Sequence, residues 1–233
     1  LTIQALTEKG DGIIIQPPVY PPFFDVIRKN GRIIEENRLK SDDGKWSIDF
    51  DEFEQLCQKS TTKAFLLCHP HNPVGREWTT DELKKMGDIC VRNNVIILSD
   101  EIHSDLMLNG RRHHPMATIS DEIANQTITY MAGSKTFNIA GFATSYLIAK
   151  NNDLRQKYVD AQEALHLQSN LMGPIALQAA YENCEPWLNE LQTYLSENVE
   201  YVIDAFKHEL PEVVVTKPEA TYLMWLDFSS LGI

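Results

Sequence analysis

The feature of the sequence that most constrains the fold is an alternation of short apolar runs with longer amphipathic segments. Several runs are continuously apolar and rich in β-branched residues, as in the run Val95-Ile96-Ile97-Leu98. Strands of this composition are typical of a sheet that helices cover on both faces. Strands are therefore expected at 12–16, 32–36, 63–68, 95–99, 127–132 and 144–149.

Segments of helical length lie between these expected strands, at 22–30, 49–59, 80–93 and 153–167. The third has a clear start signal: Thr79 or Thr80 can cap it, and Glu82 follows Thr79 by three residues, as in a capping box. An alternation of strands and helices predicts an α/β fold with a mainly parallel sheet.

The last part of the chain has a different pattern. It is mostly helical from Pro174 to Glu209, and two final strands are expected at 213–216 and 221–226. A domain boundary is expected inside the helical stretch, which divides the chain into a large domain at 1–200 and the start of a small domain at 201–233. Because the chain begins at Leu1 and stops just after an expected strand, we expect it to be a piece of a longer enzyme, cut within its large domain on the N-terminal side.

Composition excludes several classes of function. The net charge of −12 argues against a nucleic-acid surface, which needs clustered Lys and Arg. No apolar run reaches the roughly 18 residues of a membrane span. The four cysteines are scattered without a CxxC pair, which is typical of reduced thiols in a cytoplasmic protein. The His113-His114 pair has no cysteine nearby, so no metal site is expected.

Polar side chains follow three successive expected strands, at the point where each strand ends. Asn72 follows the strand at 63–68, Asp100 and His103 follow the strand at 95–99, and Ser134 and Lys135 follow the strand at 127–132. In open parallel sheets, ligands bind beyond the carboxyl ends of the strands. The sequence therefore predicts that an amide, a carboxylate and a lysine meet at one edge of the sheet.

These three residue types suit the chemistry of pyridoxal 5'-phosphate (PLP). A lysine can hold the cofactor as a Schiff base, and a carboxylate such as Asp100 keeps the pyridine nitrogen protonated so that the ring acts as an electron sink. Asn72 can donate to the phenolic oxygen of the ring, and the hydroxyl of Ser134 can donate to the phosphate. Lys135 is the expected Schiff-base lysine.

Each of these residues also has an ordinary structural interpretation. Asn72 precedes a proline, a common pair in turns. Asp100 could cap a following helix, and Lys135 could be a surface lysine. Their occurrence in this order after three successive strands favours the functional interpretation.

Three segments carry a resemblance to a known family, namely 69–79 (HPHNPVGREWT), 99–105 (SDEIHSD) and 133–141 (GSKTFNIAG). They resemble the fold-type I PLP enzymes, and most of all the MalY/PatB-type carbon–sulfur β-lyases of the class I/II aminotransferase superfamily. The resemblance implies a PLP-dependent transferase-like large domain, with a mixed, mostly parallel sheet of about seven strands between helices.

The resemblance also implies roles for individual residues. Lys135 matches the Schiff-base lysine, Asp100 the carboxylate at the pyridine nitrogen, and Asn72 the amide at the phenolic oxygen. Tyr20 matches the aromatic residue that stacks on the ring; its alternative is a packed loop residue. His103 stands where typical aminotransferases have Tyr, which favours a lyase over a transaminase.

The phosphate contacts depart from the family pattern. Ala143 stands where many aminotransferases have an arginine that binds the phosphate, so phosphate binding is expected to rest on Ser134 and backbone N–H groups. The family's glycine-containing phosphate loop and its arginine for the substrate carboxylate lie outside the sequence.

The expected activity is cleavage of cystathionine- or cysteine-type amino acids to pyruvate, ammonia and a thiol. Two alternatives stay open, a class I/II aminotransferase and an inactive fragment or regulatory binding module. The expected partners are a small amino-acid substrate and, for the intact enzyme, a second copy in a homodimer; a nucleic acid and a membrane are not expected.

Overall fold

The computed structural model describes residues 1–232, and its centre is a six-stranded sheet in the order β2-β1-β5-β6-β7-β8. Five of the strands are parallel, and β8 runs antiparallel to β7 at one edge. The expected α/β class and the mixed, mostly parallel sheet are confirmed. Among the described residues, this sheet has six strands rather than about seven. The strands are β1 (Gly12–Ile15), β2 (Ile33–Glu36), β5 (Thr62–Cys68), β6 (Ile96–Asp100), β7 (Thr127–Met131) and β8 (Tyr146–Ala149).

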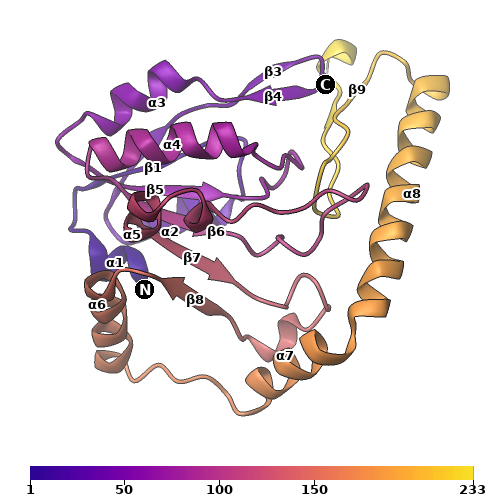
Figure 1. The fold of residues 1–233 in the computed structure, drawn as a ribbon. Helices are drawn as coiled ribbons and strands as arrows, with labels where there is room; N and C mark the ends of the chain where they lie inside the picture. Colours follow the sequence, from indigo (N-terminus) through magenta and orange to yellow (C-terminus); the bar gives the residue numbers. More distant parts are fainter. Residues whose placement is uncertain (233) are drawn as a thin grey trace.

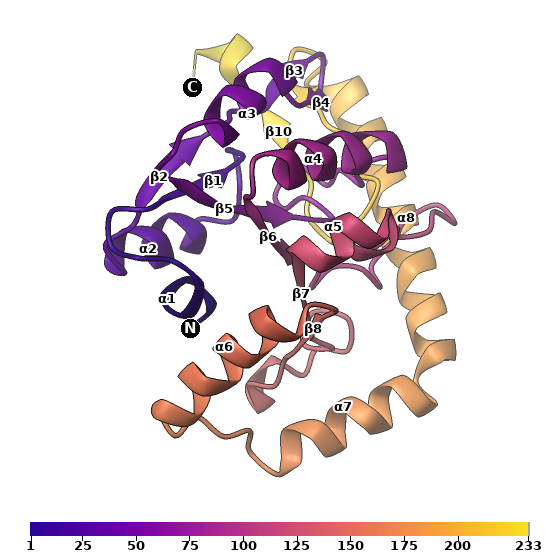
Figure 2. The same cartoon turned by 60° about the vertical axis from the view of Figure 1, so that its left-hand side comes forward.

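Helices cover both faces of this sheet, because its strands present apolar side chains alternately to the two sides (Figures 1 and 2). Ile14, Phe65 and Leu67 lie in the core under one set of helices, whereas Ile13 and Leu66 lie in the core under the other set. The first set is α3 (Phe50–Cys57), α4 (Thr80–Arg92) and α5 (Asp121–Gln126), and the second is α1 (Thr2–Leu6), α2 (Pro22–Lys29) and α6 (Asn152–Ala164).

The expected capping box is present at the start of α4. The Thr79 hydroxyl accepts from the backbone N–H of Glu82 at 3.2 Å, and the Glu82 carboxylate accepts from the backbone N–H of Thr79 at 2.8 Å. Two donors that a helix start leaves unpaired are thereby satisfied.

The structure adds elements that the sequence pattern did not predict. The polar stretch before the first strand contains α1, and a short hairpin follows β2, made of β3 (Lys40–Asp42) and β4 (Lys45–Ser47). These elements are short and carry weak periodicity, so tertiary contacts decide them. For example, Trp46 in β4 is buried and donates to the hydroxyl of Thr216 at 3.0 Å.

The C-terminal part is helical as expected and then returns to the sheet domain. Helices α7 (Met172–Asn183) and α8 (Glu185–Glu209) break at Cys184, and α8 runs along one side of the molecule (Figure 1). Two short antiparallel strands follow, β9 (Val214–Val215) and β10 (Leu226–Asp227). The predicted boundary near residue 200 falls inside α8, and the division at that point stays a prediction. Within the described chain, no helix has the length and apolar character needed to cross a bilayer.

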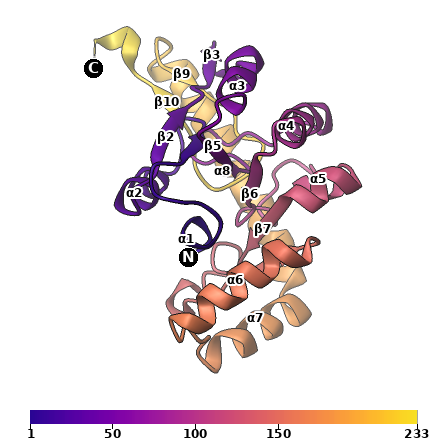
Figure 3. The same cartoon turned by 90° about the vertical axis from the view of Figure 1, so that its left-hand side faces the viewer.

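The order in which strands are added to the sheet reverses beside β1. From β1 the chain adds β2 on one side and later β5 on the other, so the loops after β1 and β5 diverge at their carboxyl ends. In open α/β sheets such a switch point leaves a crevice where ligands bind. Figure 3, turned by 90° from Figure 1, shows the strands between their two helical layers, with α6 and α7 stacked below.

Candidate active site

A cavity lies at the carboxyl ends of the central strands and encloses about 340 Å³ of space, part of it open to solvent. Five of the six predicted site residues line it, from the loops that follow four different strands. They are Tyr20 after β1, Asn72 after β5, Asp100 and His103 at and after the end of β6, and Lys135 after β7. The structure therefore brings the predicted lysine, carboxylate and amide together.

Tyr20 and Asn72 are placed by loops that are tied to each other. The His71 ring lies between the two loops, and its Nε2 is 3.0 Å from the carbonyl oxygen of Pro18. Burial lowers the pKa of His71 to about 4, so the ring is neutral. Since a carbonyl oxygen only accepts, the single ring proton is on Nε2. The Tyr20 ring meets Phe23 edge to face at 5.9 Å and stays 39% exposed.

Asp100 is the last residue of β6 and is held at the cavity by its own chain. Its Oδ1 accepts from the backbone N–H of Ile102 at 3.2 Å. Burial raises the pKa of the Asp100 carboxyl to about 6, against the lowering effects of that N–H and of the positive charge of Lys135. A cation placed beside this carboxylate would relieve the cost of its burial.

His103 lies in the turn after β6, and its side chain is buried. Burial, assisted by the charge of Lys135, lowers the pKa of His103 to about 4, so the ring is neutral near pH 7. Its Nδ1 is buried and has no hydrogen-bond partner in the described chain. At the wall of a cavity, such an atom is free to bond to water or to a ligand atom.

Lys135 lies in a tight turn after β7, in which the backbone N–H of Phe137 donates to the carbonyl of Gly133 at 2.9 Å. Ser134, directly before it, is half-buried and is not among the residues that line the cavity. The predicted contact of Ser134 with a phosphate stays a prediction.

The cavity is also lined by two residues that the sequence pattern did not predict, Cys68 and Ile102. Cys68 ends β5 in register with Asp100 on β6, and its sulfur accepts from the backbone N–H of Asn72 at 3.3 Å. Burial raises the pKa of the Cys68 thiol far above its ordinary value, so the thiol is uncharged. Cys68 could have been predicted from the sequence, because it ends an expected strand at the same edge of the sheet as Asp100.

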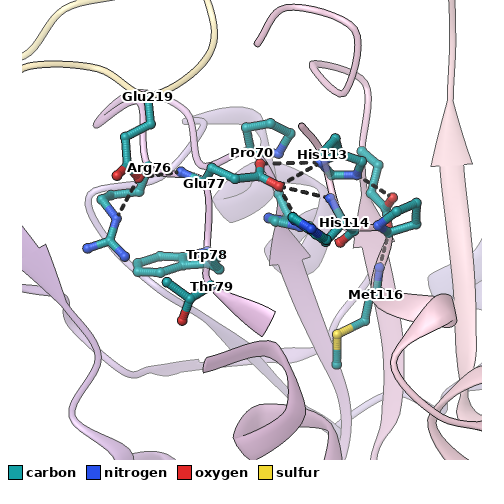
Figure 4. A network of polar contacts seen from close by, with 12 residues as sticks. Pro70, Arg76, Glu77, Trp78, Thr79, His113, His114, Met116 and Glu219 are labelled. Carbon is teal, nitrogen blue, oxygen red and sulfur yellow. Dashed lines mark hydrogen bonds and ion pairs between the residues drawn. The ribbon is translucent and has the colours of Figure 1, made fainter. Parts of the chain in front are cut away.

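Next to Asp100 in the chain, Glu101 belongs to a buried polar network with His69, Glu77 and His113, and Figure 4 shows its contacts around Glu77 and His113. His113 lies between the carboxylates of Glu101, 2.8 Å from Nε2, and Glu77, 3.1 Å from Nδ1. Burial alone would lower the pKa of His113, but its hydrogen bonds to Glu101 and Glu77 outweigh burial and raise the pKa to about 9. His113 is therefore an imidazolium between two carboxylates, and Glu101 is the direct neighbour of Asp100.

The same network contains three residues with metal-ligand atoms within 4.8 Å of one another, namely His69, Glu77 and His113. The sequence pattern does not predict this cluster, because only the fold brings His69 and Glu77 beside His113. The Nε2 atom of His69 is 3.0 Å from the carbonyl of His114, and burial lowers the pKa of His69. The neutral ring therefore carries its proton on Nε2, and both nitrogens of His113 carry protons as well. The hydrogen bonds account for this cluster, and a metal ion would have to displace them.

Comparisons with known proteins agree on one family. Residues 1–231 match the family described as aminotransferases of class I and II. The chain is 43% identical over 239 residues to cystathionine β-lyase PatB of Bacillus subtilis (strain 168), a match that covers 100% of the chain and 60% of PatB.

Two solved structures of PLP-containing proteins have the same fold. Cystalysin from Treponema denticola superposes with a TM-score of 0.97 and 39% identity, over 100% of the chain and 59% of cystalysin. The PLP-bound C–S lyase from Staphylococcus hominis superposes with a TM-score of 0.93 and 35% identity, over 98% of the chain and 57% of that enzyme. The chain spans about 60% of the length of the proteins it matches.

Proposed function

Because this chain belongs to the family of class I and II aminotransferases, we propose that it carries the cofactor-binding part of a PLP-dependent carbon–sulfur β-lyase. The observation that carries the proposal is the gathering of Lys135, Asp100 and Asn72 around one cavity. Similarity to PatB and to two solved proteins of the same fold, one of them named a C–S lyase, favours β-elimination over transamination. The activity is proposed for the complete protein, since the chain spans about 60% of these relatives.

The residues that line the cavity fit this cofactor. The cavity offers an amine, a carboxylate, an amide and an aromatic ring, which are the groups that an aldehyde, a pyridine nitrogen, a phenolic oxygen and a ring face require. The unpartnered Nδ1 of His103 adds one more polar atom at the wall. When bound, PLP supplies an electron sink for the charge that develops at the Cα atom of an amino acid.

The chain's own residues then have separate tasks in the proposed reaction. The Nζ atom of Lys135 would anchor the aldehyde and accept the Cα proton as a general base. The Asp100 carboxylate would sit beside the pyridine nitrogen and hold a proton there, and that neighbouring charge would lower the pKa of Asp100 from about 6. Asn72 would orient the ring by donating from its amide, and Tyr20 would cover one ring face.

The neutral state of His103 matters for the same chemistry. An imidazolium at this position would add a second positive charge near Lys135 and oppose protonation of the pyridine nitrogen. Because burial lowers the pKa of His103 to about 4, the ring is a neutral hydrogen-bonding group instead. β-Elimination would release a thiol and aminoacrylate, and water would then hydrolyse the aminoacrylate to pyruvate and ammonia.

An aminotransferase is the second candidate, and it is favoured by the name of the family itself. The two reactions share the contacts to the ring, so the cavity does not separate them. The third candidate is a regulatory binding module, and it is disfavoured because Lys135, Asp100 and Asn72 all line the cavity.

The test is an absorbance spectrum and a product assay on the complete protein with PLP and L-cystathionine. We expect an imine band, a borohydride-reduced adduct on Lys135 detected by mass spectrometry, and equal amounts of pyruvate and ammonia. Dependence on an added keto acid would identify a transaminase. Absence of the adduct in the wild-type protein would reject the PLP proposal.

Lys135→Ala should abolish both the adduct and the activity. Lys157→Ala is the matched control, because Lys157 is an exposed lysine on α6 and lies outside the cavity. Loss of the adduct in both variants would show that the loss in Lys135→Ala is not specific to Lys135.

The remaining proposals concern the complete protein. We propose that it acts on small amino-acid substrates in the cytoplasm as a homodimer, as the resemblance implies. Light scattering of the purified protein tests the dimer, and a monomeric mass at micromolar concentration would contradict it.

A further inference from the structure

Asp105 joins two segments of the candidate site that come from different strands. It lies in the loop after β6, two residues beyond His103, and its Oδ2 accepts from the hydroxyl of Thr136 at 2.9 Å. Thr136 directly follows Lys135 and is completely buried. The loop that follows Asp100 and the turn that carries Lys135 are therefore connected by one hydrogen bond between side chains.

The same carboxylate oxygen has a second partner. The hydroxyl of Tyr181, on α7, donates to Oδ2 at 2.8 Å, and the side chain of Gln192, on α8, donates to the backbone carbonyl of Asp105 at 2.7 Å. Burial, followed by the charge of Asp105, raises the pKa of Tyr181, so the hydroxyl keeps its proton and remains a donor. Asp105 thus sits where the lysine turn and both C-terminal helices meet.

Position matters most at Lys135, because its amine must reach both the aldehyde of the cofactor and the Cα proton of the substrate. A displacement of about 1 Å can cost roughly 100-fold in rate. The turn that carries Lys135 is short, and the buried Thr136 hydroxyl in it donates to the carboxylate of Asp105. Hydrogen bonds to an ionised acceptor are about twice as strong as neutral ones, so this contact resists displacement.

We propose that Asp105 is a positioning residue that holds the Lys135 turn in register with the Asp100–His103 loop through Thr136. The inference rests on the proposed function, in which Lys135 and Asp100 act on the same cofactor ring. The alternative role for Asp105 is purely structural, through Tyr181 and Gln192.

The two hydroxyl donors allow these roles to be separated. Thr136→Val removes the contact to the lysine turn and keeps a similar shape. Tyr181→Phe removes a donor from the same carboxylate but keeps the ring, which packs edge to face on Phe137 of that turn at 5.1 Å. Asp105→Ala removes both contacts. Asp105→Asn keeps an oxygen that can accept both hydroxyls, and therefore serves as the conservative variant.

The measurement is the rate at which the cofactor-free complete protein forms the borohydride-trapped adduct on Lys135, together with kcat, KM and the unfolding midpoint. We expect Thr136→Val and Asp105→Ala to slow adduct formation and lower kcat by roughly 10- to 100-fold, with KM little changed. The double variant Thr136→Val/Asp105→Ala should be no slower than Asp105→Ala alone, because both substitutions remove the same hydrogen bond. Tyr181→Phe should keep wild-type rates, and Asp105→Asn should recover most of the loss.

Three results would overturn the proposal. One is equal slowing by Tyr181→Phe and Thr136→Val, and another is wild-type rates in Thr136→Val and Asp105→Ala despite lower stability. The third is additive slowing in the double variant. All three require a wild-type protein that forms the adduct; a wild type that forms none would instead reject the proposed function and the positioning role with it.

Discussion

At the scale of single residues, the candidate site depends on where charge is stabilised and where it is not. Asp100 is an acid whose pKa burial raises to about 6, and His113 is a base whose pKa two glutamates raise to about 9. Glu101 connects the two, since it follows Asp100 in the chain and accepts from His113. The charged form of Asp100 therefore destabilises the fold, whereas the charged form of His113 stabilises it, and both groups make the protein less stable as the pH rises.

Asp100→Asn should stabilise the cofactor-free complete protein while removing activity. The pKa of Asp100 is raised from 3.8 to about 6, so its ionisation destabilises the fold, and that destabilisation is complete above about pH 6. At pH 8 the variant should gain about 1–3 kcal/mol in unfolding free energy and lose roughly 100-fold in turnover. Urea unfolding and the pyruvate assay measure the two effects, with the exposed Asp204→Asn as control. A variant that is less stable than wild type at pH 8 would contradict this account of Asp100.

His113→Gln should destabilise the protein most at low pH. The pKa of His113 is raised from 6.5 to about 9, so its stabilising charge is fully present below about pH 6.5 and is lost as the pH rises through 9. The difference in unfolding free energy between wild type and variant should shrink by roughly 3 kcal/mol between pH 6 and pH 9.5. The control is His208→Gln, at an exposed histidine on α8. A difference that does not change with pH would refute the imidazolium assignment.

At the scale of elements, the loop after β5 is shaped by the turn that precedes β10. Gly75 has a φ of +73°, and its backbone carbonyl accepts from the N–H groups of Glu219 and Ala220 at 2.7 and 3.1 Å. An added Cβ at Gly75 would lie 2.5 Å from Cβ and 2.9 Å from Cα of Pro218. Only glycine permits this approach of two backbones, which closes the loop that carries Asn72.

Gly75→Ala should therefore destabilise the protein by about 2–4 kcal/mol, which combines overpacking against Pro218 with the strain of a positive φ. Gly110→Ala is the matched control, because Gly110 has a φ of +70° but no atom within 4 Å of an added Cβ. The control should cost only about 1 kcal/mol. Urea unfolding of both variants gives the difference. Equal costs would show that the contact with Pro218 is easily relaxed.

At the scale of the whole molecule, the segment after α8 packs against residues from the first third of the chain. Trp46 in the β3–β4 hairpin meets Trp225 edge to face at 5.7 Å and donates to the hydroxyl of Thr216 at 3.0 Å. Glu219 forms ion pairs with Arg76 and Arg111, each with an N···O distance of 3.1 Å. The segment after α8 is thus packed against the β3–β4 hairpin and the loop of Asn72, although it is distant from both in sequence.

Trp46→Phe should loosen this connection. The variant loses the hydrogen bond from Nε1 and leaves the buried hydroxyl of Thr216 without its donor, at a cost of about 1–3 kcal/mol. Trp187→Phe, at a tryptophan that is 45% exposed, should cost less than about 1 kcal/mol. Chemical unfolding measures both variants. A loss in Trp187→Phe as large as that in Trp46→Phe would contradict the importance of the contact with Thr216.

The fold class and most of the candidate site could be predicted from the sequence, because both depend on local patterns. Apolar runs marked the six main strands to within one or two residues at each end. The rule that ligands bind at the carboxyl ends of parallel strands then selected Asn72, Asp100, His103 and Lys135. Tyr20 came from the family resemblance instead, and Ser134 was selected by its position but does not line the cavity.

Other features were decided only by the tertiary structure, because they depend on contacts between residues that are distant in sequence. His69, Glu77, Glu101 and His113 form a network only once β5, β6 and the loops beyond them are side by side. The hydrogen bonds made there outweigh burial and keep His113 charged. The hydrogen bond from Thr136 to Asp105 likewise joins loops that follow different strands. A local pattern specifies which side chains stand at the end of a strand, whereas three-dimensional packing specifies which of them meet.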